Sequence, residues 1–280
     1  MANFCAISPK VTKNLNYLGL KSIAENYDLF FVDLWGVVHN GISPFKDALT
    51  VLNELEKINK EYVLLTNAPR PNFSVKKFLE KMGISKNISN KVYTSGQASL
   101  DYLLNNFNDK KFFHFGPQRD FDLFTSFKKN KTSDIIKCEY ILCTGLFDEY
   151  SQDLNYYKKI LKSEINKKMI CTNPDLIVDK GEKREYCAGS VAKIFEDLGG
   201  VVEYFGKPHY NIYVQSTKKI DKKKVLCIGD NLSTDIRGAN MQNFSSLLIC
   251  NGIHKNELLK RNQIDLFKEY NVNVDYIQKS

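Results

Sequence analysis

The chain alternates between short apolar runs and amphipathic stretches. The apolar runs are rich in aromatic and β-branched residues, which is typical of buried parallel strands, and the clearest cover residues 29–32, 62–67 and 225–229. Between them, apolar residues recur at helical spacing. The helices predicted from that spacing cover residues 43–59, 72–82, 188–198 and 209–220. The alternation of strand and helix favours an α/β fold with a parallel sheet and right-handed crossovers.

Residues 90–188 continue this alternation with different content. Strands are predicted at residues 92–94, 112–115, 140–144 and 169–172, and helices at 96–107 and 152–166. The polar stretch 118–134 is predicted to be an irregular excursion on the surface. We therefore expect one parallel-sheet domain, formed by residues 1–89 and 189–280, which is split by an inserted α/β domain at 90–188.

Composition narrows the classes of partner. The 280 residues are 43% hydrophobic and 26% charged, as in ordinary globular proteins, and the net charge is +8. The lysines are spread thinly, without a basic stripe interleaved with aromatic residues, so we expect no nucleic-acid partner. The positive charge is compatible with a small anionic substrate.

The same survey addresses membranes and redox state. No apolar run approaches the roughly 20 residues of a membrane helix, and the N-terminus lacks the pattern of a secretory leader. The seven cysteines are an odd number without a C-x-x-C pair, and the four histidines are scattered, which argues against a zinc site. We expect a cytoplasmic protein with reduced thiols and no membrane contact.

Polar side chains follow several of the predicted strands. Asp33 and Asp230 each end an apolar strand, Thr66 and Asn67 end another, and Lys207 stands in a Gly-Lys-Pro sequence before a helix. Asp33 alone could merely cap a turn. Because a parallel sheet brings the carboxyl ends of its strands to one edge, we expect all five residues to converge. Carboxylates, a hydroxyl, an amide and a lysine together suit a phosphoryl group and a hard cation such as Mg²⁺.

The order of these motifs resembles a known family. D-x-x-G-V, L-L-T-N, G-K-P and G-D-x-x-x-x-D follow one another as in the haloacid dehalogenase superfamily of phosphatases. The chain is most similar to the class IIA (NagD-like) branch, which the segment Cys171–Asp175 also resembles, and the similarity spans residues 25–252. This resemblance implies a Rossmann-like core and a C2-type cap inserted between the second and third motifs.

The resemblance also implies roles for the motif residues. Asp33 would be the nucleophile that forms an aspartyl phosphate, Thr66 and Asn67 would hold the phosphate, and Lys207 would neutralise it. Read without the resemblance, a single lysine such as Lys207 is usually solvated.

A metal site is implied by the same comparison. Mg²⁺ would be bound by Asp33, Asp230 and the backbone carbonyl of Trp35, with Asp235 supporting it directly or through water. Asp235 could alternatively serve only to stabilise the helix N-terminus at which it stands.

Trp35 departs from the family pattern. The family's phosphatases normally carry an aspartate there, which protonates the leaving oxygen, and an indole offers one donor and no acceptor. Three outcomes follow: slow hydrolysis of activated esters, substitution by another group, or binding without turnover. His39 is the obvious substitute because its pKa range suits acid–base work, although a turn histidine more often faces solvent.

The leading hypothesis is a Mg²⁺-dependent phosphohydrolase acting on a small phosphate monoester, of sugar phosphate or nucleotide type, with activity reduced by Trp35. A non-catalytic or regulatory protein that binds a phosphorylated metabolite is the alternative, and carbon–halogen or carbon–phosphorus cleavage is a weaker third. Substrate identity lies in the cap, where the sequence selects none. A homodimer through the cap surface is compatible with the sequence and is not determined by it.

Overall fold

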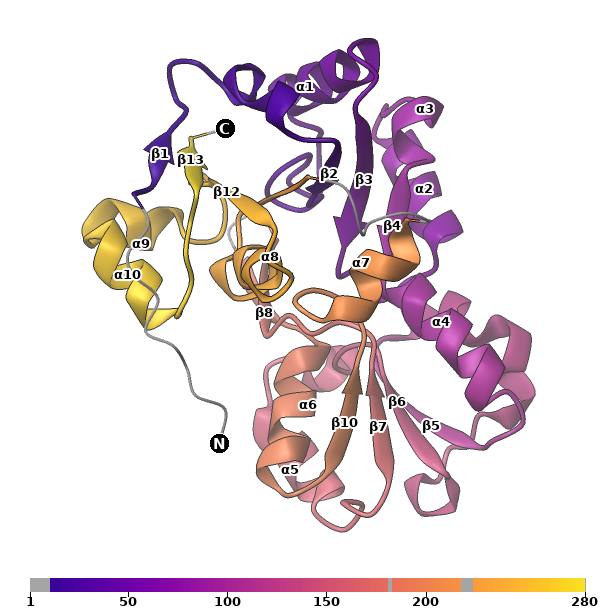
Figure 1. Cartoon of the computed structure of the whole chain (residues 1–280). Coiled ribbons are helices and arrows are strands. Elements are labelled where there is room, and N and C mark those ends of the chain that lie inside the picture. The colour runs from indigo at the N-terminus through magenta and orange to yellow at the C-terminus, as the bar shows by residue number, and fades with distance from the viewer. Residues whose placement is uncertain (1–10, 181–182, 218–223, 280) are drawn as a thin grey trace. The chain divides into compact units, whose positions relative to one another are not determined.

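A computed structural model describes residues 11–180, 183–217 and 224–279 of the chain (Figure 1). Contacts divide the chain into two compact units, one formed by residues 1–63 and 219–280 and the other by 64–218. The end of the helix predicted over 209–220 lies outside the described residues. Among the described helices, none combines the length and the apolar character that crossing a membrane requires.

A seven-stranded sheet contains the strands predicted at 29–32, 62–67 and 225–229, together with the strand at 92–94 that was predicted within the inserted domain. Its order is β1-β13-β12-β11-β2-β3-β4, and the pairings recorded within each unit are parallel. The strands are β1 (Lys13–Asn14), β2 (Leu29–Val32), β3 (Glu61–Thr66), β4 (Val92–Thr94), β11 (Val225–Gly229), β12 (Ser245–Ile249) and β13 (Tyr276–Gln278). The chain runs outward from β2 to β4 in one direction and from β11 to β13 in the other. The order therefore reverses between β2 and β11, which is where open α/β sheets bind ligands.

Helices connect these strands, and those predicted over 43–59 and 72–82 are present. The helices are α1 (Lys46–Lys57), α2 (Asn72–Lys81), α3 (Lys86–Ser89), α8 (Arg237–Met241), α9 (Lys255–Lys260) and α10 (Gln263–Glu269), with 3-10 turns at Leu20–Ser22 and Ala24–Asn26. The turn after β11 is a π-helical stretch at Leu232–Ile236 that continues into α8. The elements from α9 to β13 were not predicted.

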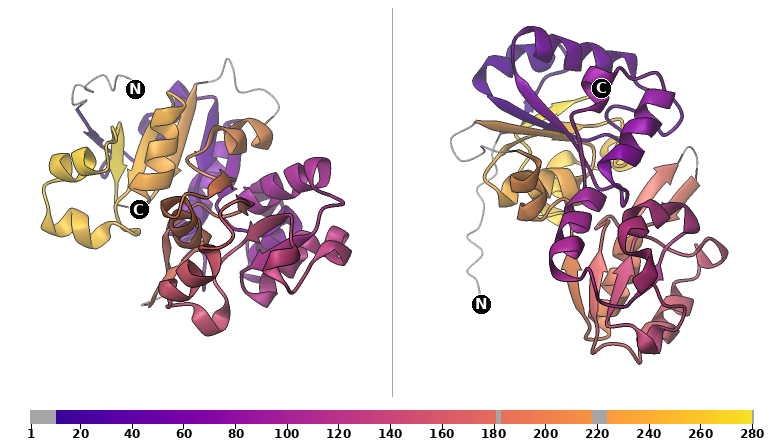
Figure 2. Two further views of the ribbon diagram at one scale, coloured as in Figure 1. Left: turned by 90° about the horizontal axis from the view of Figure 1, so that it is seen from below. Right: turned by 90° about the vertical axis from the view of Figure 1, so that its right-hand side faces the viewer.

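A separate four-stranded parallel sheet confirms the inserted α/β domain (Figures 1 and 2). Its order is β10-β7-β6-β5, with β5 (Phe112–Phe115), β6 (Tyr140–Cys143), β7 (Lys168–Cys171) and β10 (Val201–Tyr204). Strand β10 lies beyond the predicted insertion and yet pairs with β7 along its whole length. The pairing therefore extends this sheet past residue 188, and the predicted domain boundaries themselves stay predictions.

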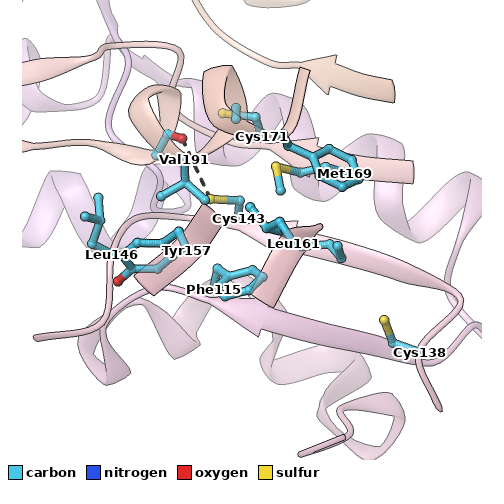
Figure 3. Packing of buried hydrophobic residues seen from close by; sticks show 13 residues of the cluster. Phe115, Cys138, Cys143, Leu146, Tyr157, Leu161, Met169, Cys171 and Val191 are labelled. Carbon is cyan, nitrogen blue, oxygen red and sulfur yellow. Dashed lines mark hydrogen bonds between the residues drawn. The ribbon is translucent and has the colours of Figure 1, made fainter. Parts of the chain in front are cut away.

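The two faces of the second sheet are covered by different helices. On one face, strand residues such as Phe115, Cys143 and Cys171 pack against α5 (Leu154–Leu161) and α6 (Ala188–Asp197) (Figure 3). On the other, Phe112 and Tyr140 pack against α4 (Ser95–Asn106) and the 3-10 stretch η3 (Gln118–Asn130). The alternation follows from the two-residue period of a strand.

The stretch predicted as an irregular surface excursion, 118–134, is therefore only partly external. Leu123, Phe124 and Phe127 are almost fully buried in the core of the second sheet. Polar residues separate Leu123 and Phe124 from Phe127, and non-helical backbone at Phe124 and Phe127 interrupts the 3-10 stretch, so no continuous helical period runs through it.

The remaining elements of this unit are short. They are the antiparallel pair β8 (Ile177–Lys180) and β9 (Lys183–Tyr186), helix α7 (Tyr210–Ser216), and 3-10 turns at Ile135–Lys137 and Asp148–Tyr150.

Six cysteines are free among the described residues. Burial raises the pKa of the Cys143 thiol to about 12, so this thiol is unreactive at neutral pH.

Candidate active site

The turn after β2 begins at Asp33. The Asp33 N–H donates to the carbonyl of Ile228 at 2.8 Å, so the residue continues the pairing of β2 with β11. Gly36 follows with a φ of +82°, a left-handed conformation that favours glycine, and its N–H donates to the His39 carbonyl. The sequence therefore ends the strand and reverses the chain within a few residues of the carboxylate.

Three aspartates meet at this end of the sheet. Asp33 follows β2, Asp230 follows β11, and Asp235 lies in the π-helical turn. One carboxylate oxygen from each lies within 4.8 Å of the others, and all three residues are buried. We call Asp33, Asp230 and Asp235 the acidic group, and their convergence agrees with the sequence prediction.

Glycines make room for the acidic group. A β-carbon on Gly36 would lie 2.1 Å from a carboxylate oxygen of Asp230, and one on Gly252 would lie 2.0 Å from the same oxygen. Gly229 is similarly close to Asp235. The Ile253 N–H donates to Asp230 at 2.8 Å. Backbone packed this tightly fixes the carboxylate of Asp230 from two sides.

The charges of the acidic group indicate which kind of ligand it could bind. Like charges at this separation repel, and burial weakens the screening by water, so a positive charge beside the three carboxylates is favourable. Carboxylate oxygens are the ligands that hard divalent cations prefer. The acidic group therefore fits a metal ion.

Trp35 and His39 form the other part of the turn. Their rings meet edge to face at 5.4 Å, and the outer edge of the indole packs on Gly41, where a β-carbon would lie 2.5 Å away. Nδ1 of His39 accepts a hydrogen bond from the Gly41 N–H at 3.0 Å. His39 is buried rather than solvent-facing, and this burial lowers its pKa to about 4. At neutral pH the imidazole is thus uncharged.

A second group of polar residues lies in the unit formed by residues 64–218. Oδ1 of Asn67 accepts from the Lys207 N–H at 2.7 Å, and Nδ2 donates at 3.0 Å both to the Lys207 carbonyl and to Oδ1 of Asp175. Lys207 is buried, and its Nζ donates to the Leu65 carbonyl at 2.9 Å. We call Asn67, Asp175 and Lys207 the lysine group.

Thr66 adjoins the lysine group through the chain. It ends β3, is buried, and its Oγ1 accepts a hydrogen bond from the Ala68 N–H at 3.3 Å. The structure thus brings Asp33, Asp230 and Asp235 together, and separately Asn67 and Lys207. Convergence of both groups on one substrate stays a prediction.

Sequence reasoning gave no role to Asp175. A usable signal was present: Asn173-Pro174-Asp175 follows a buried strand, as Asp33 and Asp230 do. What hid the role is that the partner, Asn67, lies 108 residues away.

Comparisons with known proteins agree with this geometry. Residues 30–127 match a family model described as haloacid dehalogenase-like hydrolase, and residues 204–273 match one described as HAD-hydrolase-like. No functionally curated protein matches the chain in sequence.

Solved structures share the fold over most of the chain. A haloacid dehalogenase-like hydrolase from Brucella suis 1330 is 29% identical with a TM-score of 0.77, covering 88% of this chain and 91% of that one. A 4-nitrophenylphosphatase from Thermotoga maritima is 23% identical with a TM-score of 0.69, covering 92% and 96%. A putative NagD protein is 23% identical with a TM-score of 0.65, covering 82% and 90%.

Proposed function

The chain belongs to the haloacid dehalogenase-like hydrolases, and on that premise we propose that it is a Mg²⁺-dependent phosphohydrolase of small phosphate monoesters. The observation that carries the proposal is the acidic group, three buried carboxylates at the point where the strand order reverses. The substrate would be of sugar phosphate or nucleotide type. The 4-nitrophenylphosphatase among the similar structures supports phosphate esters as the substrate class.

The proposal assigns a task to each residue of the site. The Asp33 carboxylate attacks phosphorus and forms an aspartyl phosphate, while the bond to the leaving oxygen breaks. Water then cleaves the aspartyl phosphate and releases phosphate. Thr66 and Lys207 bind and neutralise the phosphoryl oxygens, with the main chain of Asn67 beside them.

The metal would be held by the acidic group. Asp33, Asp230 and the backbone carbonyl of Trp35 would be ligands, with Asp235 supporting them. Bound Mg²⁺ would supply positive charge to the phosphoryl oxygens.

Trp35 gives the proposal its particular form. An indole cannot protonate a leaving oxygen and then activate water, and a positioned acid–base group is worth ~10²–10⁴-fold in rate. We therefore expect reduced activity that depends steeply on how easily the leaving group departs.

His39 is the candidate substitute acid–base. Its neighbour on the turn is Trp35, two residues after the nucleophile. With Nδ1 accepting from Gly41 and a pKa of about 4, His39 is neutral at pH 7 and a weak proton donor. His39→Gln keeps a polar side chain of similar size and removes the imidazole, so a fall in turnover at unchanged unfolding temperature supports this role.

A second candidate is a protein that binds a phosphorylated metabolite without turning it over. The indole at position 35 and the lowered pKa of His39 favour it, since neither residue supplies a ready proton at neutral pH. It predicts Mg²⁺-assisted binding of a phosphate monoester with no product.

The deciding experiment compares wild type with Asp33→Asn on 4-nitrophenyl phosphate, with Mg²⁺ and with a chelator. We expect Asp33→Asn to lower turnover by at least ~10³-fold, because the nucleophile is lost, and the chelator to abolish it. Asp47→Asn, on the exposed face of α1, is the matched control.

The outcomes separate the two candidates. Unchanged activity in Asp33→Asn removes that residue from its assigned role. Tight binding of phosphate monoesters by wild type, with no product by mass spectrometry across a metabolite panel, favours the binding protein.

A further inference from the structure

The side chain of Asn67 has no spare donor. Its amide has two N–H groups, which go to the Lys207 carbonyl and to Asp175, and its oxygen accepts from the Lys207 N–H. This assignment of amide oxygen and nitrogen is unique, because a backbone N–H can only donate and a carbonyl can only accept. Any contact of Asn67 with phosphate must therefore come from its main chain.

Asn67 instead holds the backbone of Lys207 at both of its polar groups. The preceding residue, Gly206, has a φ of +119°, and a β-carbon there would lie 2.6 Å from Oδ1 of Asn67 and 2.7 Å from Pro174. The glycine thus permits the close approach of Asn67 and Pro174. Together with the Nζ bond to the Leu65 carbonyl, these contacts fix Lys207 at its backbone and at its ammonium end.

Asp175 is itself rigidly placed. Its N–H donates to Oδ1 of Asn173 at 2.9 Å, and its carbonyl accepts from the Gly189 N–H at 3.1 Å. A β-carbon on Gly189 would lie 2.5 Å from that carbonyl, so the start of α6 presses directly on the segment. The Ser95 hydroxyl bonds the Thr172 carbonyl at 2.6 Å. The carboxylate therefore reaches Asn67 from a fixed frame.

We propose that Asp175 is a positioning residue that orients the Asn67 amide, which in turn sets Lys207 for binding phosphate. The inference rests on the proposed function, since it concerns the task of Lys207. Two bonds to Lys207 hold the oxygen and one N–H of the amide, and the charge-assisted bond to the Asp175 carboxylate holds the remaining N–H, so the whole amide is fixed in one orientation. The segment that follows β7 of the inserted sheet thereby contributes to the orientation of Lys207, through Asp175 and Asn67.

The test uses Asp175→Ala, Asp175→Asn and Asn67→Ala, together with the double variant of the two alanine changes. Calorimetry measures the affinity for inorganic phosphate with Mg²⁺, and kinetics measures kcat/KM on 4-nitrophenyl phosphate. Asp197→Ala is the control, because this carboxylate lies on the exposed side of α6 and pairs with Lys193.

We expect Asp175→Ala to weaken phosphate binding and kcat/KM by about tenfold, the scale of one lost charge-assisted hydrogen bond. Asp175→Asn should stay within about threefold of wild type, because its amide oxygen still accepts from Asn67. The double variant should be no worse than Asn67→Ala, since Asp175 acts through Asn67. The control should match wild type.

Three results overturn the inference. Additive losses in the double variant would show that Asp175 acts independently of Asn67. A fall in unfolding temperature for Asp175→Ala with unchanged phosphate affinity would leave it a structural role only. Wild-type behaviour of Asp175→Ala, in a protein whose hydrolysis requires Asp33, defeats this inference alone, whereas a wild type that neither binds phosphate nor hydrolyses its esters defeats the proposed function as well.

Discussion

The acidic group and the lysine group differ in how their polar side chains are paired. Asp33, Asp230 and Asp235 bring three like charges within 4.8 Å of one another in a buried setting. In the lysine group, the Asn67 amide donates to the Lys207 carbonyl and to Asp175 and accepts from the Lys207 N–H, and the Lys207 ammonium has a carbonyl partner. The first group fits a cation, while in the second the side-chain amide of Asn67 is fully hydrogen-bonded within the chain. The acidic group is thus suited to binding a metal ion, whereas the hydrogen bonds of the lysine group are already formed.

The largest of these effects tests the absence of an acid–base group at position 35, in the turn beside the acidic group. Trp35→Asp should raise kcat/KM for an alkyl phosphate by ~10²-fold, because a carboxyl group can protonate a poor leaving oxygen. The gain should shrink for 4-nitrophenyl phosphate, whose leaving group needs little protonation. Steady-state rates across a series of phosphate esters with increasing leaving-group pKa measure this dependence.

Trp35→Asn is the matched control for that series. It removes the same packing on Gly41 and His39 and supplies no acid. Equal rates for the aspartate and asparagine variants would show that steric relief, rather than proton donation, changes the activity. A lower rate in both variants would favour His39 as the acid–base group of the wild-type protein.

The next effect contrasts the two groups in stability. Saturating Mg²⁺, at about 100 times its Kd, should raise the free energy of unfolding of wild type by about 2.7 kcal/mol. Asp230→Asn should be more stable than wild type without metal, because repulsion is relieved, and should lose most of the response to Mg²⁺. Asn67→Ala should be less stable by about 1–3 kcal/mol with or without Mg²⁺, since it leaves buried groups unpaired.

Urea unfolding with Mg²⁺ and with a chelator measures all three proteins. If Asp230→Asn were destabilised in the absence of metal, the acidic group would be a structural hydrogen-bond cluster and not a site that awaits a cation. An Mg²⁺ response retained in that variant would place the metal elsewhere.

The smallest effect concerns a single buried carboxylate, whose influence on stability comes mainly from burial rather than from repulsion within a group of carboxylates. Asp120, in the second unit, is buried and accepts from the Thr144 hydroxyl, and burial raises its pKa to about 6. Because the folded protein binds this proton more tightly than the unfolded chain, the contribution of Asp120 to stability is fully present below about pH 4 and is lost as the pH rises to about 6. Asp120→Asn should therefore be more stable than wild type at pH 7, with or without Mg²⁺.

Unfolding measured from pH 4 to pH 8 checks this expectation. The advantage of Asp120→Asn should grow between pH 4 and pH 6 and stay constant above. Asp197→Asn, an exposed carboxylate that pairs with Lys193, is the control and should show no such growth. A gain that appeared only without Mg²⁺ would mean that Asp120 belongs to the metal response.

Much of the fold followed from hydrophobic periodicity. Strands such as β2, β3 and β11 and helices such as α2, α4 and α6 lie within a residue or two of their predicted bounds, because a buried strand and an amphipathic helix each leave a local pattern. The segment η3 and the elements after β12 were missed or misjudged. Their apolar anchors are few and spaced irregularly, so only packing shows where they lie.

The sequence by itself determined which residues end the central strands, and it correctly predicted that Asp33 and Asp230 would gather there, because strand ends in a parallel sheet share an edge. The place of Asp235 beside them was implied by the family resemblance. The tertiary structure alone decided how those residues are used. It buried His39, pressed Gly252 against Asp230, and committed the amide of Asn67 to Lys207 and Asp175. The reason is that hydrogen-bond partners 108 and 140 residues apart are chosen by packing, which leaves no periodic trace along the chain.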